Sequence, residues 1–230
     1  LLDYNRGSSP LVITDGIFAL TGEIAPLNQI YEVVRKHDAI LVVDDAHATG
    51  VLGSTGKGTP EHFGLPGDGK IYQTETMSKA LGGYGGFISG SRSVTDMIRE
   101  KSATYQASTA LPPPIAAAGI ASLAIIGKNP GLRKELLDKA WMIREAVTAM
   151  DFKTTHFRTP IVPVIFDSAD KAVELSEFLG ENGVIAPSVN YPGRQQLHLV
   201  RIAVSVTHTE DQISQLLGLL KKWKDKNESN

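Results

Sequence analysis

Ile40-Leu41-Val42-Val43-Asp44 is an unbroken apolar run that ends in a carboxylate. Continuous rather than alternating apolarity is typical of a strand covered on both faces, as in a parallel sheet. A similar run, Leu11–Asp15, ends at Gly16, and a helical pattern opens at Pro26 between the two runs. Strand, helix and strand at this spacing predict a βαβ unit, whose ligands bind at the carboxyl ends of the strands. Asp44 is therefore expected where a ligand would bind.

A glycine-rich stretch with one lysine lies downstream, after a third predicted strand, Ile71–Thr76. It reads Thr74-Glu75-Thr76-Met77-Ser78-Lys79-Ala80-Leu81-Gly82-Gly83-Tyr84-Gly85-Gly86. Glycines allow close approach of the backbone to a ligand, and hydroxyls such as those of Thr76 and Ser78 can donate to phosphate oxygens. We expect Lys79 to be buried, because desolvation lowers the pKa of an amine and makes it a nucleophile. The alternative is a tight glycine turn between strands, with an exposed lysine.

The rest of the chain predicts further helices and strands and a division into two parts. An Ala-rich helix, 115–126, carries almost no charge and is expected to be buried or to lie in a subunit interface. The pattern breaks at 127–130, so residues 1–127 are assigned to a large domain and 128–230 to a small α+β domain. The other expected elements are a strand at 87–90, a helix capped by Ser93, a long helix after Pro130, strands at 161–166 and 199–206, a helix at 169–180, and a last helix opened by a capping box of Thr209 and Gln212.

Composition excludes several classes of protein. The 230 residues carry a formal net charge of −2 and no basic block, which argues against nucleic acid or an anionic membrane as the main partner. The absence of cysteine rules out a disulfide framework and fits a cytoplasmic protein. No apolar run reaches the roughly 18 residues that a membrane helix needs. One large or two modest soluble domains with a substantial core are expected.

Lys79, Asp44 and His47 together suggest the chemistry of pyridoxal phosphate (PLP). A lysine can form an imine with the cofactor's aldehyde, and a carboxylate such as Asp44 can keep the ring nitrogen protonated. His47 could stack on or hydrogen-bond the ring, while Thr76 and the glycine turn would meet the phosphate. Each residue could instead be an ordinary turn residue. A metal site from Asp44, Asp45 and His47 lacks the usual ligand spacing, and a Ser-His-Asp triad lacks its G-x-S-x-G turn.

Five segments of the chain read, in order, Asp15-Gly16-Ile17-Phe18, Gly22-Glu23-Ile24-Ala25-Pro26-Leu27, Val43-Asp44-Asp45-Ala46-His47-Ala48-Thr49-Gly50, Gly56-Lys57-Gly58 and Thr76-Met77-Ser78-Lys79-Ala80-Leu81-Gly82. They resemble the motifs of the α-oxoamine synthases, which are PLP-dependent enzymes of fold type I. The resemblance implies the C-terminal part of the large mixed-sheet domain followed by the small α+β domain. It also implies that Lys79 forms the imine, Asp44 pairs with the pyridine nitrogen, His47 bonds the phenolic oxygen and Thr76 the phosphate.

Further residues take roles from the same resemblance. Ser108 and Thr109 match a segment that reaches the phosphate of the neighbouring subunit, which implies a homodimer with a shared active site. Arg201 matches the arginine that binds the amino-acid carboxylate, a task suited to a bidentate side chain. The chain departs from the family pattern in having Ala19 where a serine is usual and Ser78 where a glycine is frequent.

We therefore expect a cytoplasmic acyltransferase that condenses a small amino acid with an acyl-CoA to an aminoketone with loss of CO2, of the 8-amino-7-oxononanoate synthase or glycine C-acetyltransferase type. The alternatives are an aminotransferase of the same fold and an inactive piece that serves as a structural or dimerisation module. The family's ring-stacking histidine and a glycine-containing phosphate turn have no counterpart before Leu11. The chain is therefore expected to be a fragment of a longer enzyme, rather than a degenerate relative.

Overall fold

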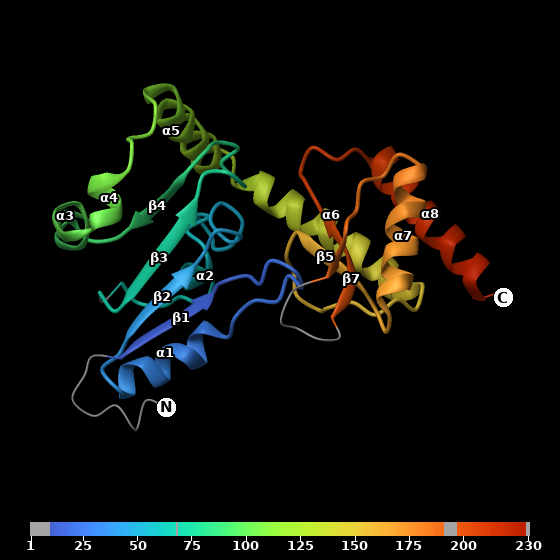
Figure 1. Ribbon diagram of the computed structural model, residues 1–230, viewed down its shortest axis with the longest axis horizontal. Helices are drawn as coiled ribbons and strands as arrows, with labels where there is room; N and C mark the ends of the chain where they lie inside the picture. The colour runs from blue at the N-terminus through green and yellow to red at the C-terminus, as the bar shows by residue number, and fades with distance from the viewer. Residues whose placement is uncertain (1–9, 68, 191–196, 229–230) are drawn as a thin grey trace. The chain divides into compact units, whose positions relative to one another are not determined.

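The computed structural model describes residues 10–67, 69–190 and 197–228, and these form two compact units (Figure 1). The first unit consists of Ile24–Pro130 with the described residues before Ala19. The second unit consists of Ala19–Glu23 with the described residues from Gly131 onward. The sequence placed a domain boundary at 127/128, and it gave no sign that residues 19–23 belong with the C-terminal part of the chain.

A four-stranded mixed sheet in the order β1-β2-β3-β4 forms the centre of the first unit. β1 and β2 are parallel, β2 and β3 are parallel, and β4 runs antiparallel to β3. This arrangement confirms the predicted mixed sheet and its βαβ connection. The strands are β1 (Leu11–Asp15), β2 (Ile40–Asp44), β3 (Ile71–Thr76) and β4 (Gly86–Ser89).

Helix α1 (Leu27–Lys36) covers one face of this sheet. Its buried residues Leu27, Tyr31 and Val34 pack with Leu41 and Val43 of β2 in one apolar cluster. The expectation that both faces of the strands are covered is wrong for the described residues. Alternate residues of β1 point away from α1, and among them Leu11 is 57% and Ile13 68% exposed, because no described element packs against them.

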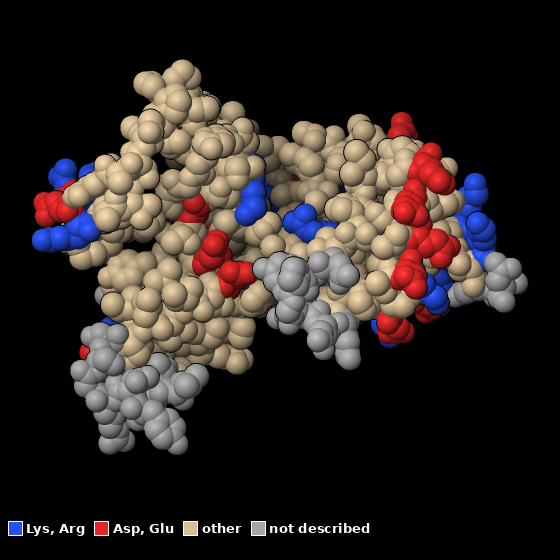
Figure 2. Space-filling model, viewed as in Figure 1, with Lys and Arg blue, Asp and Glu red and all other residues tan. Residues whose placement is uncertain are grey.

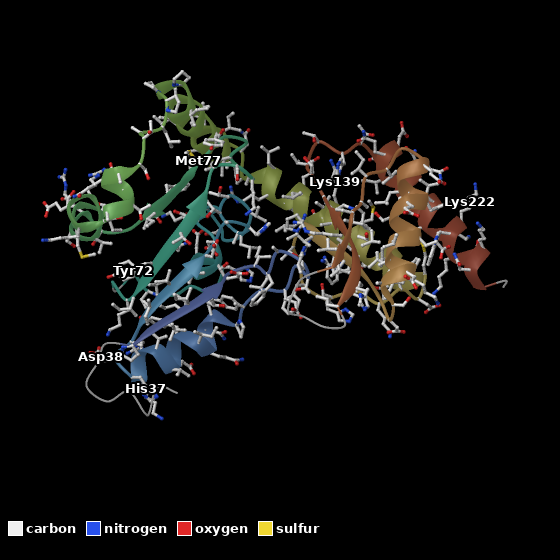
Figure 3. All side chains as sticks on the ribbon, in the orientation of Figure 1. His37, Asp38, Tyr72, Met77, Lys139 and Lys222 are labelled. Carbon is white, nitrogen blue, oxygen red and sulfur yellow. The ribbon has the colours of Figure 1, made fainter. Side chains whose placement is uncertain are left out.

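Four more helices complete the first unit, and the last of them contacts the loop that carries Lys79. A Cβ atom on Gly119 would lie 3.0 Å from the Met77 sulfur, and the Ser122 hydroxyl donates to the Leu81 carbonyl at 2.7 Å. Figure 3 labels Met77 and Tyr72 at opposite ends of β3. The helices are α2 (Thr59–His62), α3 (Arg92–Lys101), α4 (Ala103–Ala107) and α5 (Pro113–Lys128).

One sequence expectation for these helices needs correction, and another is reduced to one of its two alternatives. The residue that caps α3 is Ser91, not Ser93, and its hydroxyl bonds that of Ser93 instead of a helix N–H. Within this chain the Ala-rich helix α5 is not buried, since Ile120 is 70% and Leu123 52% exposed. An interface role for α5 stays open.

The second unit is an α+β layer around an antiparallel sheet in the order β5-β7-β6. Phe152, Phe166 and Trp223 form an aromatic group in its core, with ring centroids 5.6–6.2 Å apart. Acidic side chains follow α7 on the face shown in Figure 2. The elements are α6 (Pro130–Ala149), β5 (Ile161–Phe166), α7 (Ala169–Glu181), β6 (Ser188–Asn190), β7 (His198–Ala203) and α8 (Glu210–Glu228).

The predicted capping box at the start of α8 is confirmed. The Thr209 N–H donates to the Gln212 side-chain oxygen at 3.0 Å, and the Gln212 N–H donates to the Thr209 hydroxyl at 3.2 Å. Two N–H groups at the helix end thereby gain partners.

Candidate functional site

Polar residues gather at the carboxyl end of the first sheet, on the face that α1 leaves open. The strand register aligns Asp15 of β1 with Asp44 of β2 and Asp44 with Thr74 of β3. Aligned residues on neighbouring strands point to the same face, and Thr76, two residues after Thr74, shares it. Two carboxylates and two hydroxyls therefore lie side by side at this edge.

Lys79 belongs to the same electrostatic group. Burial raises the pKa of the Asp15 carboxyl, the neighbouring Asp44 charge raises it further, and the Lys79 ammonium acts in the opposite direction. Charges affect one another in this way only at short range, because water and salt screen the rest. The strand register thus brings Asp15 and Asp44 together, and Lys79 lies near enough for its charge to act on the Asp15 carboxyl.

Lys79 itself is exposed, as is Asp44, so the expected burial of the lysine is wrong for the described residues. The physical reason is that the carboxyl ends of β1, β2 and β3 open onto the uncovered face of the sheet. Their exposure leaves both side chains accessible to a ligand.

The turn after β2 contains two adjacent aspartates in different environments. Asp44 accepts a hydrogen bond from the Ala46 N–H at 3.0 Å, while its neighbour Asp45 is fully buried. The Asp45 carboxylate accepts from the N–H and hydroxyl of Thr59 at 2.7 and 2.6 Å and from the Gln73 amide at 2.8 Å. Burial raises the pKa of Asp45, and these hydrogen bonds oppose that shift.

Two glycines make room for the Asp45 carboxylate. A Cβ atom on Gly16 would lie 1.9 Å from one of its oxygens, and one on Gly58 would lie 2.0 Å from the other. Asp45 therefore joins the end of β1, the turn after β2, the start of α2 and strand β3 through one side chain. This network fixes the backbone from which Asp44 projects.

The turn that carries His47 lies against the loop that carries Lys79. Gly50, which closes this turn at φ +80°, comes so near that an added Cβ atom would lie 2.9 Å from the Ala80 Cβ. The Thr49 hydroxyl donates to the Glu75 carboxylate at 3.1 Å and ties the same turn to β3. His47 and Lys79 therefore lie on adjoining segments.

The loop after β3 presents hydroxyls on a defined backbone. The Thr76 and Ser78 hydroxyl oxygens lie 2.8 Å apart, and the Thr76 hydroxyl donates to the Gly85 carbonyl at 3.1 Å. Gly82 and Gly85 have φ values of +59° and +96°, which only glycine adopts readily. Such hydroxyls at a glycine-rich turn suit a phosphate group.

The remaining predicted residues lie elsewhere in the chain. Ser108 and Thr109 are exposed residues that follow α4 in the first unit, and the Ser108 hydroxyl donates to the Thr104 carbonyl at 2.6 Å. Arg201 lies on β7 in the second unit, where its Nε donates to the Ala19 carbonyl at 2.7 Å. Burial lowers the pKa of this guanidinium.

Sequence reasoning missed Asp15 and Asp45 as parts of the site. Asp15 could have been found, because β1 and β2 both read as five-residue apolar runs that end in aspartate. Asp45 had no such signal, since its partners Thr59 and Gln73 are distant in sequence.

Two classes of site find no support in the described residues. Nowhere in residues 10–67, 69–190 and 197–228 do three or more His, Cys, Asp or Glu side chains gather to hold a metal ion. No single helix of this part of the chain is long and apolar enough to cross a membrane, although the bent pair α5 and α6 meets that test jointly by length and composition.

The aminotransferase class I and II family model matches residues 1–220. The chain belongs to this family. Members that it resembles include the 8-amino-7-oxononanoate synthases of Thermoanaerobacter pseudethanolicus, 38% identical over 213 residues, and of Bacillus subtilis, where a product called 8-amino-7-oxononanoate synthase 1 is 36% identical over 217 residues. In each comparison the match covers 92% of this chain and 54% of the relative. The chain thus spans about half the length of these curated relatives.

Solved structures agree with this family assignment. Serine palmitoyltransferase of Sphingomonas wittichii superposes with a TM-score of 0.87 at 27% identity, covering 96% of this chain and 57% of that one. The 8-amino-7-oxononanoate synthase of Francisella tularensis gives 0.84 at 25% identity, covering 98% and 66%. The resemblance to fold-type-I PLP-dependent enzymes, and the corresponding fold, are confirmed.

Proposed function

We propose that the protein acts as a PLP-dependent acyltransferase that condenses a small amino acid with an acyl-CoA. A carbon–carbon bond forms between the α-carbon and the acyl carbonyl carbon, the α-carboxylate leaves as CO2, and the thioester bond breaks to release CoA. The product is an aminoketone. The observation that carries the proposal is the grouping of Asp15, Asp44 and Lys79 at the carboxyl end of one sheet. Relatives named 8-amino-7-oxononanoate synthase support the reaction class.

The residues at this edge fit pyridoxal phosphate. Asp44 supplies an exposed carboxylate, Lys79 an exposed amine, and Thr76 with Ser78 a pair of hydroxyls on a glycine-rich loop. A carboxylate can pair with a protonated ring nitrogen, an amine with an aldehyde, and hydroxyls with a phosphate. When bound, PLP supplies an electron sink for the electrons left on the α-carbon.

Each side chain then has a defined task. Asp44 would pair with the protonated ring nitrogen, and His47 would donate a hydrogen bond to the phenolic oxygen. Thr76 would bind the phosphate. Lys79 would supply the amine for the cofactor's aldehyde and would move the proton at the α-carbon of the substrate. Arg201 binds the amino-acid carboxylate with its planar fork of N–H groups.

A homodimer with a shared active site is part of the proposal. Ser108 and Thr109 would bind the phosphate in the neighbouring subunit, and both are exposed. Three large apolar side chains of α5, namely Ile120, Leu123 and Ile125, are also exposed by 52–70%. A surface of this kind is stabilised by burial against a second copy. A cytoplasmic location fits the lack of cysteine.

The decisive experiment supplies the full-length protein with PLP, a set of small amino acids and a set of acyl-CoA thioesters. The proposal predicts release of free CoA thiol and CO2 in equal amounts, both dependent on the amino acid. Thr109→Ala should weaken the retention of PLP, while the alignment of Asp15 with Asp44 in the sheet stays the same. The family match also admits an aminotransferase, which would consume a 2-oxo acid and release neither CoA nor CO2. A protein that retains no PLP while it melts normally would support a purely structural module.

A further inference from the structure

The segment Ala19–Glu23 belongs to the second unit, although its sequence neighbours Phe18 and Ile24 belong to the first. Ile17 and Ile24, at the two ends of this excursion, pair as an antiparallel bridge. Three backbone carbonyls of the segment, those of Ala19, Thr21 and Gly22, accept hydrogen bonds from side chains of the second unit. The second unit therefore holds this segment through its backbone carbonyls.

One of these bonds involves the arginine proposed to bind the substrate carboxylate. Arg201 donates its Nε–H to the Ala19 carbonyl at 2.7 Å. Within residues 10–67, 69–190 and 197–228, its two terminal nitrogens make no hydrogen bond and no ion pair. A guanidinium is planar, so a bond at Nε fixes the plane in which the terminal N–H groups lie. Those groups remain available for a bidentate contact with a carboxylate.

The backbone two and three residues after Ala19 is in turn held by two threonines. The Thr155 hydroxyl donates to the Thr21 carbonyl at 2.8 Å, and the fully buried Thr159 hydroxyl donates to the Gly22 carbonyl at 2.8 Å. Gly22 is required at this point: its φ is +67°, and a Cβ atom there would lie 2.5 Å from the Ile161 carbonyl oxygen. Both threonines therefore act on the backbone just after Ala19.

We propose that the Ala19–Glu23 segment is a positioning element for the amino-acid substrate, in which the Thr155 and Thr159 hydroxyls orient Arg201 through the Ala19 carbonyl. The inference rests on the proposed function, because it takes the carboxylate of an amino acid as the ligand of Arg201. Thr155 and Thr159 touch no reacting atom in this scheme; they are positioning residues.

The test compares two double variants of the full-length protein. Thr155→Val with Thr159→Val removes both hydroxyls at nearly constant volume, whereas Thr155→Ser with Thr159→Ser keeps them. Arg201 is observed directly through its side-chain Nε–H signal in a nitrogen-15 NMR spectrum, assigned with Arg201→Lys. We expect slow hydrogen exchange at this N–H in the parent and the serine variant, and fast exchange in the valine variant.

Amino-acid binding should follow the NMR result. The valine variant should bind the amino acid about tenfold more weakly, or show a KM about tenfold higher with an unchanged kcat, while the serine variant matches the parent. The KM for the acyl-CoA should not move. Fast exchange in the parent, or equal exchange and equal affinity in both variants, would overturn the proposal. If the valine variant does not fold, Thr155→Val alone, at a half-buried position, is compared with Thr155→Ser in the same way.

These outcomes are separate from the proposed reaction. A protein that releases no CoA from any acyl-CoA, yet shows the expected exchange pattern and carboxylate affinity, would refute the acyltransferase function and leave the positioning role standing. Conversely, an active enzyme with an unprotected Arg201 Nε–H would refute only the positioning role.

Discussion

The two units of this chain differ in how completely they bury their apolar residues. The second unit buries a single large cluster, which includes Leu175, Leu179 and Leu220 with no exposed surface. The first unit buries one side of its sheet beneath α1 and leaves Leu11, Ile13 and much of α5 exposed. It also leaves Asp44 and Lys79 open at the sheet's edge. The second unit is thus built around one closed core, although single apolar side chains such as Ile185 are exposed, whereas the first leaves one face of its sheet and a helix open to a ligand and a partner.

A pair of leucine truncations gives the largest expected contrast between the units. Leu175→Ala in α7 should lower the free energy of unfolding by about 2–5 kcal/mol, because it opens a cavity in a closed core. Leu123→Ala on α5, where the side chain is 52% exposed, should change it by less than about 0.5 kcal/mol in dilute, monomeric protein.

Urea denaturation over a range of protein concentrations measures the change in unfolding free energy for both leucine variants. The loss from Leu175→Ala should not depend on concentration, while that from Leu123→Ala should grow as dimers form. A large, concentration-independent loss at Leu123 would show that α5 belongs to the core of its own chain.

The two adjacent aspartates of the first unit give the next contrast. Asp45→Ala leaves the buried donors of Thr59 and Gln73 without their acceptor, so it should cost about 2–4 kcal/mol of unfolding free energy. Asp44→Ala removes an exposed side chain and should cost less than about 0.5 kcal/mol, while PLP affinity falls. Equal losses of stability in the two variants would contradict the assignment of separate roles.

The smallest effects concern pH, where two glutamates of the first unit should respond in opposite directions. Burial of Glu61 acts to raise its pKa, but hydrogen bonds from Lys57, Thr55 and Ser54 outweigh it and lower the pKa to about 2. Glu61 therefore contributes stability that is present above its unfolded pKa and is lost as pH falls towards 2. Glu61→Gln should be destabilising at pH 7, and the difference should shrink in acid.

Burial raises the pKa of Glu75, with a smaller contribution from the Asp45 charge, against hydrogen bonds from Ser89 and Thr49. Its contribution is present below the unfolded pKa of about 4.5 and is lost as pH rises through the raised value. Glu75→Gln should therefore become more favourable, relative to the parent, as pH rises. Thermal melts between pH 3 and 7 compare the two variants, and parallel pH profiles would count against the described network.

The sequence predicted local features of the fold well and tertiary partners poorly. Apolar runs and helical patterns located β1, β2, β3, α1 and β5, because these elements are specified by residues close in the chain. The positions of Asp44, His47, Thr76 and Lys79 along the chain indicated the site, and the resemblance to a known family added Ser108, Thr109 and Arg201. The hydrogen bonds of Asp45, the excursion of Ala19–Glu23 and the carbonyl partner of Arg201 could not be predicted, since each joins residues far apart in sequence.

The burial predicted for several side chains of the first unit was wrong for a related reason. An apolar strand indicates that it can be covered on both faces, but the pattern does not say which residues cover it. For Leu11 and Ile13 of β1 and for Ile120 and Leu123 of the Ala-rich helix, no described residue does so. The same openness places Lys79 at the surface instead of in a buried pocket.

Reduction of the PLP-loaded, full-length protein with borohydride, followed by peptide mapping, tests the central claim most directly. Borohydride fixes the cofactor on the amine that holds its aldehyde, so the mass of the modified peptide identifies the lysine. The account predicts modification of Lys79 alone and none in Lys79→Ala. Modification of another lysine, or equal modification after Lys79→Ala, would contradict it.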